Sequence, residues 1–380
     1  MYSVFQVEWA HLGVEDIRAF FDTAGDEGLT WEAKAGKIDT RSIGEAVCGF
    51  ANSVGGFLVL GVEGGKGESW TLPGVSLPDS EPLAWASRVI TDRTRPTPKF
   101  DVKAWSKDGG RHVVVIRVEP TPVPPCLTVD GLAFERVTSQ TIKIKDPAVL
   151  ADLLRRGEAA REAALARARA ATRQVEDPAP IASDLHLSEV TRFCLGLSAV
   201  GGPSNVSARL FSQRFMNRLY EVVRSVLLDA GQVREWGSPR LVPDHLHTML
   251  KCRVELPWPT MPMRQHYLIE AHRDGSVGIR WESSTQNISI ESLANEQVRG
   301  AWRGATALVM ELGGYGDGIL TMRSRAADRA TSGLATMDEC LERWVDLDDP
   351  ESLDLASVAR ELTRAAGYAA YEPEETEPRA

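Results

Sequence analysis

The sequence has no long apolar run, no paired cysteines and no excess of basic residues, and each absence removes a class of protein. No apolar stretch approaches the roughly 18 residues that a membrane-spanning helix needs. The five cysteines are scattered and form no CxxC pair. This spacing argues against a zinc site and a disulfide framework, and it suits a reducing cytoplasm. Because the formal net charge is −10, any contact with nucleic acid must use a local basic patch.

The start of the chain also lacks the pattern of a secretion signal. The segment MYSVFQVEWAHLGVED contains acidic side chains early and no basic segment followed by an apolar one. Together with the cysteine usage, this predicts a cytoplasmic protein that does not associate with membranes. With 380 residues, of which 43% are hydrophobic and 25% charged, the chain is long enough for two globular domains.

One stretch, residues 38–63, has the clearest local pattern. Apolar residues at steps of three and four over 43–54 predict a helix, and the apolar run 57–60 predicts a buried strand. Gly55 and Gly56 separate the two, as expected where a helix passes directly into a strand. Further strands are predicted at 31–34, at 100–105 and at 112–119. The order indicates an α/β N-terminal domain with a mixed sheet and flanking helices.

The rest of the chain divides by composition and pattern. We expect the N-terminal domain over residues 1–147, a helical linker over 148–180, an α+β domain over 181–370 and an acidic tail over 371–380. The Ala/Arg/Glu composition of the linker predicts a solvated helix or a coiled connection between the domains. In the α+β domain the pattern predicts helices near 187–200 and 207–230, strands near 240–242, 245–256, 266–272 and 277–281, a helix near 290–312, a strand near 319–323 and two closing helices.

Four charged residues around the central stretch have the chemistry of a nuclease site. On a strand with period 2, Glu32 and Lys34 share one face, and Glu63 leaves the end of the strand 57–60. Cleavage of a phosphodiester with Mg²⁺ or Mn²⁺ needs two or three converging carboxylates and a nearby cation. Glu27, Glu32 and Glu63 could therefore bind the metal while Lys34 stabilises phosphate charge. The alternative is that Glu32 and Lys34 form an exposed pair on the sheet surface.

Basic side chains gather between residues 88 and 145. Residues 21–147 contain 15 Lys and Arg against 17 Asp and Glu, a net charge of −2, which is not the footprint of a strong duplex binder. The alternative to a nucleic-acid contact is an ordinary solvated face. The candidate contacts are Arg88, Arg93, Arg95, Lys99, Lys103 and Arg136, with Lys143 and Lys145 after them.

Several short motifs follow one another in a set order between residues 20 and 147. They are Glu27-x4-Glu32-x-Lys34, Cys48-Gly49-Phe50-Ala51-Asn52-Ser53-x-Gly55-Gly56, Leu60-Gly61-Val62-Glu63, Pro124-Pro125 and Ala133-Phe134-Glu135-Arg136. In this order they resemble the Schlafen AlbA-like domain, which occurs in many bacterial proteins and in the animal Schlafens. The resemblance implies binding of DNA or RNA, in a regulatory or defence-related role. For some animal members it also implies metal-dependent RNA cleavage by three carboxylates.

Carried over by position, the spaced glutamates of the family fall on Glu27 and Glu32, and its acid after Gly-Val falls on Glu63. Members often have two successive aspartates there, whereas Gly64 follows Glu63. If the second aspartate is the metal ligand, that carboxylate is missing from this chain. The leading hypothesis is therefore a nucleic-acid-binding protein. The alternatives are a metal-dependent endoribonuclease and a protein-interaction or ligand-sensing module, and the second half could also form a homodimer.

Overall fold

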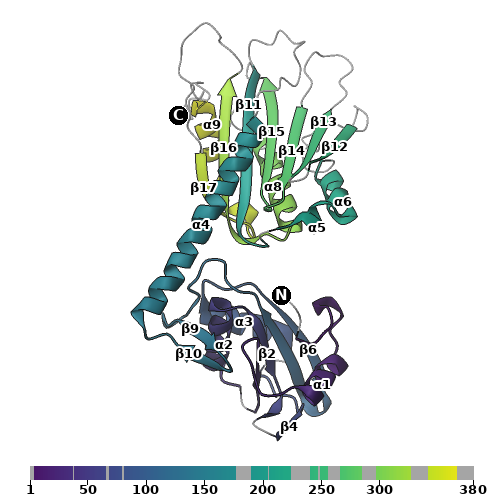
Figure 1. Ribbon diagram of the computed structural model, residues 1–380, viewed down its shortest axis with the longest axis vertical. Coiled ribbons are helices and arrows are strands. Elements are labelled where there is room, and N and C mark those ends of the chain that lie inside the picture. Colours follow the sequence, from purple (N-terminus) through teal and green to yellow (C-terminus); the bar gives the residue numbers. More distant parts are fainter. Residues whose placement is uncertain are drawn as a thin grey trace, which may run out of the picture. The chain divides into compact units, whose positions relative to one another are not determined.

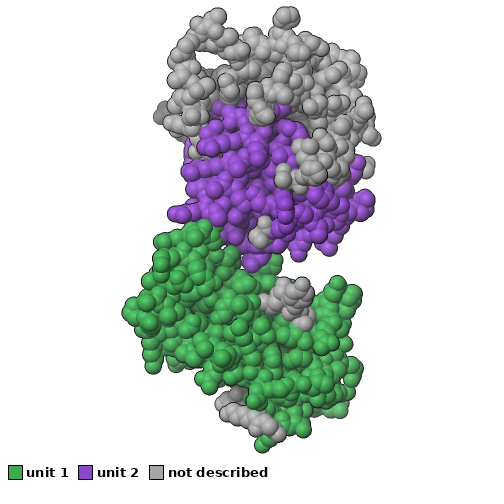
Figure 2. Space-filling view, viewed as in Figure 1, with its two compact units in different colours: residues 1–160 green, residues 161–380 purple. Residues whose placement is uncertain are grey.

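The chain has two compact units, Met1–Ala160 and Arg161–Ala380 (Figure 2). Each has its own sheet and its own apolar core. The predicted acidic tail, 371–380, lies outside the described residues. The computed structural model describes residues 4–36, 38–65, 68–78, 81–176, 190–203, 205–223, 240–246, 249–255, 266–284, 297–326 and 341–365.

The first unit alternates short helices with short strands (Figure 1). Its helices are η1 (Trp9–His11), α1 (Val14–Thr23), α2 (Thr40–Asn52), α3 (Pro82–Arg93) and η2 (Asp108–Gly110). Its strands are β1 (Trp31–Lys34), β2 (Gly56–Leu60), β3 (Glu63–Gly65), β4 (Glu68–Thr71), β5 (Thr94–Arg95), β6 (Phe100–Lys107), β7 (Arg111–Val118), β8 (Leu127–Thr128), β9 (Phe134–Val137) and β10 (Gln140–Lys143).

The main sheet of this unit is mixed, with the strand order β1-β2-β7-β6. Strand β1 runs parallel to β2, and the other pairs are antiparallel. Both faces of β2 are buried, because Leu58 and Leu60 pack with α2 and α3 while Phe57 and Val59 pack with α1. This explains why the sequence of β2 is continuously apolar rather than alternating. The predicted α/β domain with a mixed sheet and flanking helices is confirmed.

Two glycines make the passage from α2 into β2 possible. The backbone of Gly55 has φ +76°, and its N–H donates to the Phe50 carbonyl at 2.9 Å, which satisfies an end carbonyl of the helix. Gly56 lies against the Phe50 ring, and a Cβ added there would be 2.8 Å from the Thr30 carbonyl oxygen. A larger residue at this position would therefore push the helix away from the sheet.

The second unit contains one antiparallel seven-stranded sheet with the order β12-β13-β14-β15-β11-β16-β17. One face packs against helices around Trp281 and Trp302, so the predicted α+β class is confirmed. The strands are β11 (Val190–Gly201), β12 (Arg240–Leu246), β13 (Met249–Glu255), β14 (His266–His272), β15 (Val277–Ser284), β16 (Tyr315–Ala326) and β17 (Leu341–Asp346). The helices are α5 (Ser207–Leu210), α6 (Gln213–Val222), α8 (Arg299–Glu311), η5 (Pro350–Ser352) and α9 (Leu355–Ala365).

The helix predicted near 187–200 was wrong. Residues 190–201 form β11, which lies between β15 and β16. Phe193, Leu195 and Leu197 alternate along it and enter the apolar core, so the period of this segment is 2 and not 3.6. After β16 the described residues also contain β17, a strand that the pattern did not predict.

Helix α4 (Pro147–Glu176) covers residues 148–176 of the predicted linker, and residues 177–180 lie outside the described residues. The boundary between the two units falls within α4. Its last four turns are not simply solvated. Ala164, Ala168, Ala171 and Val175 are buried, and the Thr172 hydroxyl lies 2.5 Å from the Thr321 hydroxyl on β16. These small side chains let the helix lie close to the polar face of the sheet, so residues 161–176 are part of the second unit.

Candidate functional site

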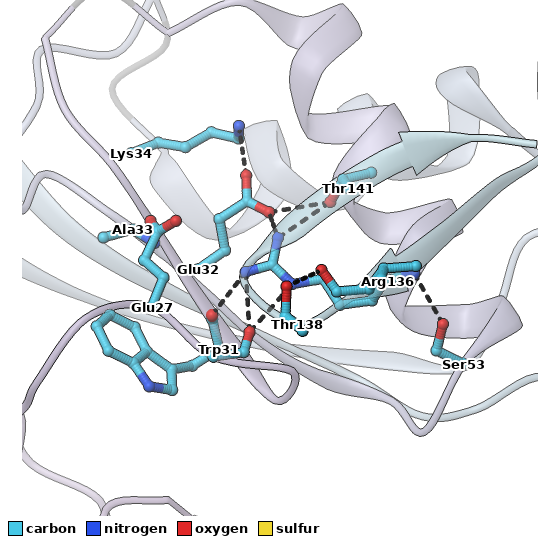
Figure 3. A network of polar contacts seen from close by, with 11 residues as sticks. Glu27, Trp31, Glu32, Ala33, Lys34, Ser53, Arg136, Thr138 and Thr141 are labelled. Atoms are coloured by element: carbon cyan, nitrogen blue, oxygen red, sulfur yellow. Dashed lines mark hydrogen bonds and ion pairs between the residues drawn. The ribbon is translucent and has the colours of Figure 1, made fainter.

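The motifs of the first unit meet at the carboxylate of Glu32. Strand β1 places Glu32 and Lys34 on one face, as predicted, and Lys34 Nζ lies 2.7 Å from Glu32 Oε1. The other carboxylate oxygen, Oε2, accepts hydrogen bonds from Arg136 Nη1 and, at 3.0 Å, from Thr141 Oγ1 (Figure 3). Glu32 is only 8% exposed. The alternative of an exposed surface pair is therefore wrong.

Arg136 provides the cation beneath Glu32, and its side chain is 1% exposed. Besides Glu32, its guanidinium donates to the carbonyl oxygens of Gly28, at 3.0 and 3.2 Å, and of Trp31, at 2.9 Å. It also lies over the Phe50 ring, 5.1 Å from the centroid. A planar group with several fixed donors suits such a site better than a lysine would. Arg136 was predicted to contact nucleic acid, but the structure buries its charge inside the domain.

The loop after α2 holds the strand that carries Arg136. The Asn52 amide donates to the Phe134 carbonyl at 2.8 Å, and Ser53 Oγ accepts a hydrogen bond from the Arg136 backbone N–H at 2.9 Å. Asn52 also bonds the backbone of Cys126 on both sides, accepting from its N–H and donating to its carbonyl. The polar residues of the motif Asn52-Ser53 thus fix the segments before and within the hairpin β9–β10.

Glu27 lies in the loop before β1, where the charges of Glu32, Lys34 and Arg136 act on it. Its Oε1 accepts a hydrogen bond from the Ala33 backbone N–H at 2.8 Å. Burial raises the pKa of Glu27 above its ordinary value, and the charge of Glu32 adds to the rise, while the Ala33 bond and the cations Arg136 and Lys34 oppose it. Two carboxylates and two cations therefore share one partly buried network, which we call the Glu32 network.

Glu63 does not join the Glu32 network. It is exposed on β3, which pairs with β4 rather than with β1. Among the described residues, no group of three or more His, Cys, Asp or Glu side chains is placed to hold a metal ion. Both oxygens of Glu32 already bind cations or donors of the protein. The predicted site of Glu27, Glu32 and Glu63 for Mg²⁺ or Mn²⁺ is therefore not assembled, and the donor set does not fit such a metal.

The remaining basic candidates fall into two groups. Lys103 donates to the carbonyls of Ala10 and Leu12, and Arg93 donates to Thr40 Oγ1 at 3.0 Å, so both serve the fold. The other predicted contacts are exposed near the end of α3 and the strands after it. They are Arg88, Arg95 and Lys99, with Lys143 and Lys145 at the end of the hairpin β9–β10.

Sequence reasoning missed Asn52, Ser53 and Thr141 as members of the site. Asn52 and Ser53 were interpreted only as part of a turn, although an asparagine directly before a buried strand was a usable signal. Thr141 gave none, because its role depends on the pairing of Thr141 with Arg136 across the hairpin.

Comparison with known proteins agrees with the geometry of the first unit. Residues 27–145 match the family model described as Schlafen, AlbA_2, and this range contains every member of the Glu32 network. Residues 27–145 are therefore a domain of the Schlafen AlbA_2 type, as predicted, and the C-terminal half has no family match. No curated protein matches the chain.

One similar solved structure is a crystal structure of the DIP2311 protein from Corynebacterium diphtheriae, at 16% sequence identity. The match covers 57% of this chain and 42% of that chain, with a TM-score of 0.26. A likeness this distant supports no conclusion about fold or function. None of the described helices is both long enough and apolar enough to cross a membrane.

Proposed function

We propose that the first unit binds nucleic acid through phosphate contacts and does not cleave it. The observation that carries the proposal is the division of its charges. The charges of the Glu32 network are used internally, whereas Arg88, Arg95 and Lys99 stay exposed along one stretch of a domain of the Schlafen AlbA_2 type. Exposed lysine and arginine side chains bind phosphate and release counterions, independently of sequence.

The contact surface is built at the end of α3. Arg95 Nη1 donates to the carbonyl of Thr94 at 2.7 Å and to that of Thr91, so its side chain is fixed over the last turn of the helix. Arg88 lies on the same helix, and Lys99 directly precedes β6. Two exposed arginines and an exposed lysine suit a contact with the nucleic-acid backbone that is weak and depends on salt.

The Glu32 network supports binding without cleavage. Cleavage would need at least two carboxylates free to take hard cations. Here Glu32 is held by Lys34, Arg136 and Thr141, and Glu63 lies elsewhere on β3. Removing Glu32 from these partners would leave the buried Arg136 without its main counter-charge. The network therefore acts as a structural ion pair that ties β1 to the hairpin β9–β10.

Binding is tested by fluorescence anisotropy of the full chain with labelled single-stranded DNA, single-stranded RNA and duplex. We expect the triple variant Arg88→Ala, Arg95→Ala and Lys99→Ala to lower the salt dependence, the slope of log K against log[salt], by roughly two to three units in magnitude, depending on the nucleic acid. The control is Arg18→Ala, Arg155→Ala and Arg303→Ala. It removes the same charge from exposed arginines that pair with Glu15, Asp152 and Glu351. An equal decrease of this slope in both triple variants would contradict the proposal that Arg88, Arg95 and Lys99 form the contact surface.

Cleavage is tested with tRNA and single-stranded DNA in Mn²⁺ and in EDTA. We expect intact substrate in both. Cutting that needs Mn²⁺ and disappears in Glu27→Gln would overturn binding without cleavage and would favour the endoribonuclease. If no substrate is bound even at low salt, the proposal fails and a protein-interaction role is left.

We place this binding in the cytoplasm, in a regulatory or defence-related role. The scattered cysteines support a reducing compartment. The second unit would then sense a ligand, recognise a partner or dimerise the protein, and nucleic-acid binding would depend on that event.

A further inference from the structure

An open groove lies between two helices of the second unit, α6 and α8. Its volume is ≈550 Å³. We call the apolar residues of its lining the floor; they are Ala307 and Met310, and Met310 is 45% exposed. We call the charged and polar residues of the lining the rim; they are Arg214, Asn217, Arg218, Glu221 and Glu311.

The groove follows from the pattern of α6. Phe215, Leu219 and Val222 point into the core of the unit. The residues at 214, 217, 218 and 221 have the spacing of a second helical stripe and line the groove instead. This stripe is as long as a full heptad, and helices commonly pack along such stripes.

Exposed apolar side chains are found on, or directly before, the two helices that form this groove, and one of them, Met310, lines it. In the described part of the second unit, the large apolar side chains that are exposed are Phe211, Tyr220, Met310 and Trp344. Phe211 directly precedes α6, Tyr220 is on it, and Met310 is on α8. Three of the four therefore flank one pair of helices. Such clustering on a soluble protein marks an interaction surface.

The charges of the rim are balanced in sign. Arg214 lies 2.5 Å from Glu311, and Arg218 lies 2.9 Å from Glu221. Along α6 the arginines come first and the glutamate comes last. A nucleic acid, or a partner of one charge, would meet as many like charges as opposite ones. The rim is complementary to a copy of itself turned around, which is what a two-fold interface requires.

We propose that this groove is the interface with a second copy of the chain, in which α6 packs antiparallel to α6 of the partner subunit. A two-fold axis near Asn217 and Arg218 puts Arg214 opposite Glu221 of the partner subunit, and the reciprocal pair forms on the other side. The apolar floor at Met310 supplies burial, while the charges set the register. This interface is independent of the nucleic-acid surface of the first unit.

The test is sedimentation velocity of the full chain over a range of concentrations, without nucleic acid. We expect a reversible monomer–dimer equilibrium. Met310→Glu should weaken it by about tenfold or more, because a charge would be buried in the floor. Glu221→Arg should weaken the dimer, because the new arginine would face Arg214 of the partner subunit. The double variant Arg214→Glu, Glu221→Arg should recover much of the lost affinity. The control is Arg303→Ala, which removes a charge from α8 at its ion pair with Glu351, outside the groove.

Two outcomes would overturn the proposal. One is a wild-type chain that stays monomeric up to concentrations on the order of 100 μM, about 5.5 kcal/mol of association. The other is a dimer whose dissociation constant is the same in Met310→Glu and Glu221→Arg as in the wild type. Circular dichroism shows whether each variant is folded, so a loss of dimer can be separated from a loss of fold.

Discussion

The Asn52 side chain closes a ring of two hydrogen bonds on the backbone of Cys126, 74 residues further along the chain. Its Nδ2 donates to the Cys126 carbonyl at 2.8 Å, and its Oδ1 accepts from the Cys126 N–H at 2.6 Å. Asn52 is 3% exposed. This pair of bonds imitates one step of a β-ladder and ties the end of α2 to the segment that leads into the hairpin β9–β10.

Asn52→Ala is expected to destabilise the first unit by about 3 kcal/mol. The substitution leaves the Cys126 N–H and the carbonyls of Cys126 and Phe134 buried without this partner, and each such group costs about 1–3 kcal/mol. The measurement is urea unfolding of the full chain, followed by a signal of the first unit. Gln140→Ala, at an exposed position of β10, is the control and should change the stability by less than about 0.5 kcal/mol.

Arg136→Met is expected to lower the free energy of unfolding by about 3 kcal/mol, because it removes the buried partner of Glu32. Lys34, 2.7 Å from Glu32 Oε1, is then the cation that remains beside this carboxylate. Glu32→Gln should cost less, since the amide still accepts from Arg136 and Thr141. The double variant Arg136→Met, Glu32→Leu should recover part of the loss. The free energies of unfolding of the wild type, Arg136→Met, Glu32→Leu and their double variant form a double-mutant cycle, and additive single effects would contradict the coupling.

Glu27 is expected to make the stability of the first unit fall as the pH rises. Its pKa in the folded state is raised above the ordinary value of 4.5, mainly by burial. The protonated form therefore contributes stability at low pH, and this contribution is lost as the pH rises through the folded-state pKa. In Glu27→Gln the uncharged amide still accepts a hydrogen bond from the Ala33 N–H. The free energy of unfolding of this variant should therefore increase relative to that of the wild type as the pH rises above 4.5. Parallel pH–stability curves would contradict this.

Gly56→Ala is expected to destabilise the passage from α2 into β2 by about 1–3 kcal/mol or to prevent folding of the unit. The added Cβ would meet the Phe50 ring and lie 2.8 Å from the Thr30 carbonyl oxygen. Gly25→Ala is the matched control, because nothing lies within 4 Å of its added Cβ. Thermal unfolding of both variants separates this contact from the general effect of replacing a glycine.

Much of the fold of the first unit could be predicted from its sequence. The helix over α2, the glycine turn and the strand β2 are local features, and their apolar spacing is visible without the structure. The second unit was less predictable. The sequence of β11 alternates apolar and small residues, and a segment of this kind fits either a helix or a strand until its neighbours are known.

For the candidate site, the sequence by itself determined the residue types and their order. Glu27, Glu32, Lys34 and Arg136 can all be identified from the sequence, because their motifs are local. Only the tertiary structure decided which of them meet. Arg136 reaches Glu32 across 104 residues because Asn52 and Ser53 fix the hairpin, whereas Glu63 lies on β3, which pairs with β4. A side chain's partner depends on where distant backbone segments pack, and local spacing does not encode that.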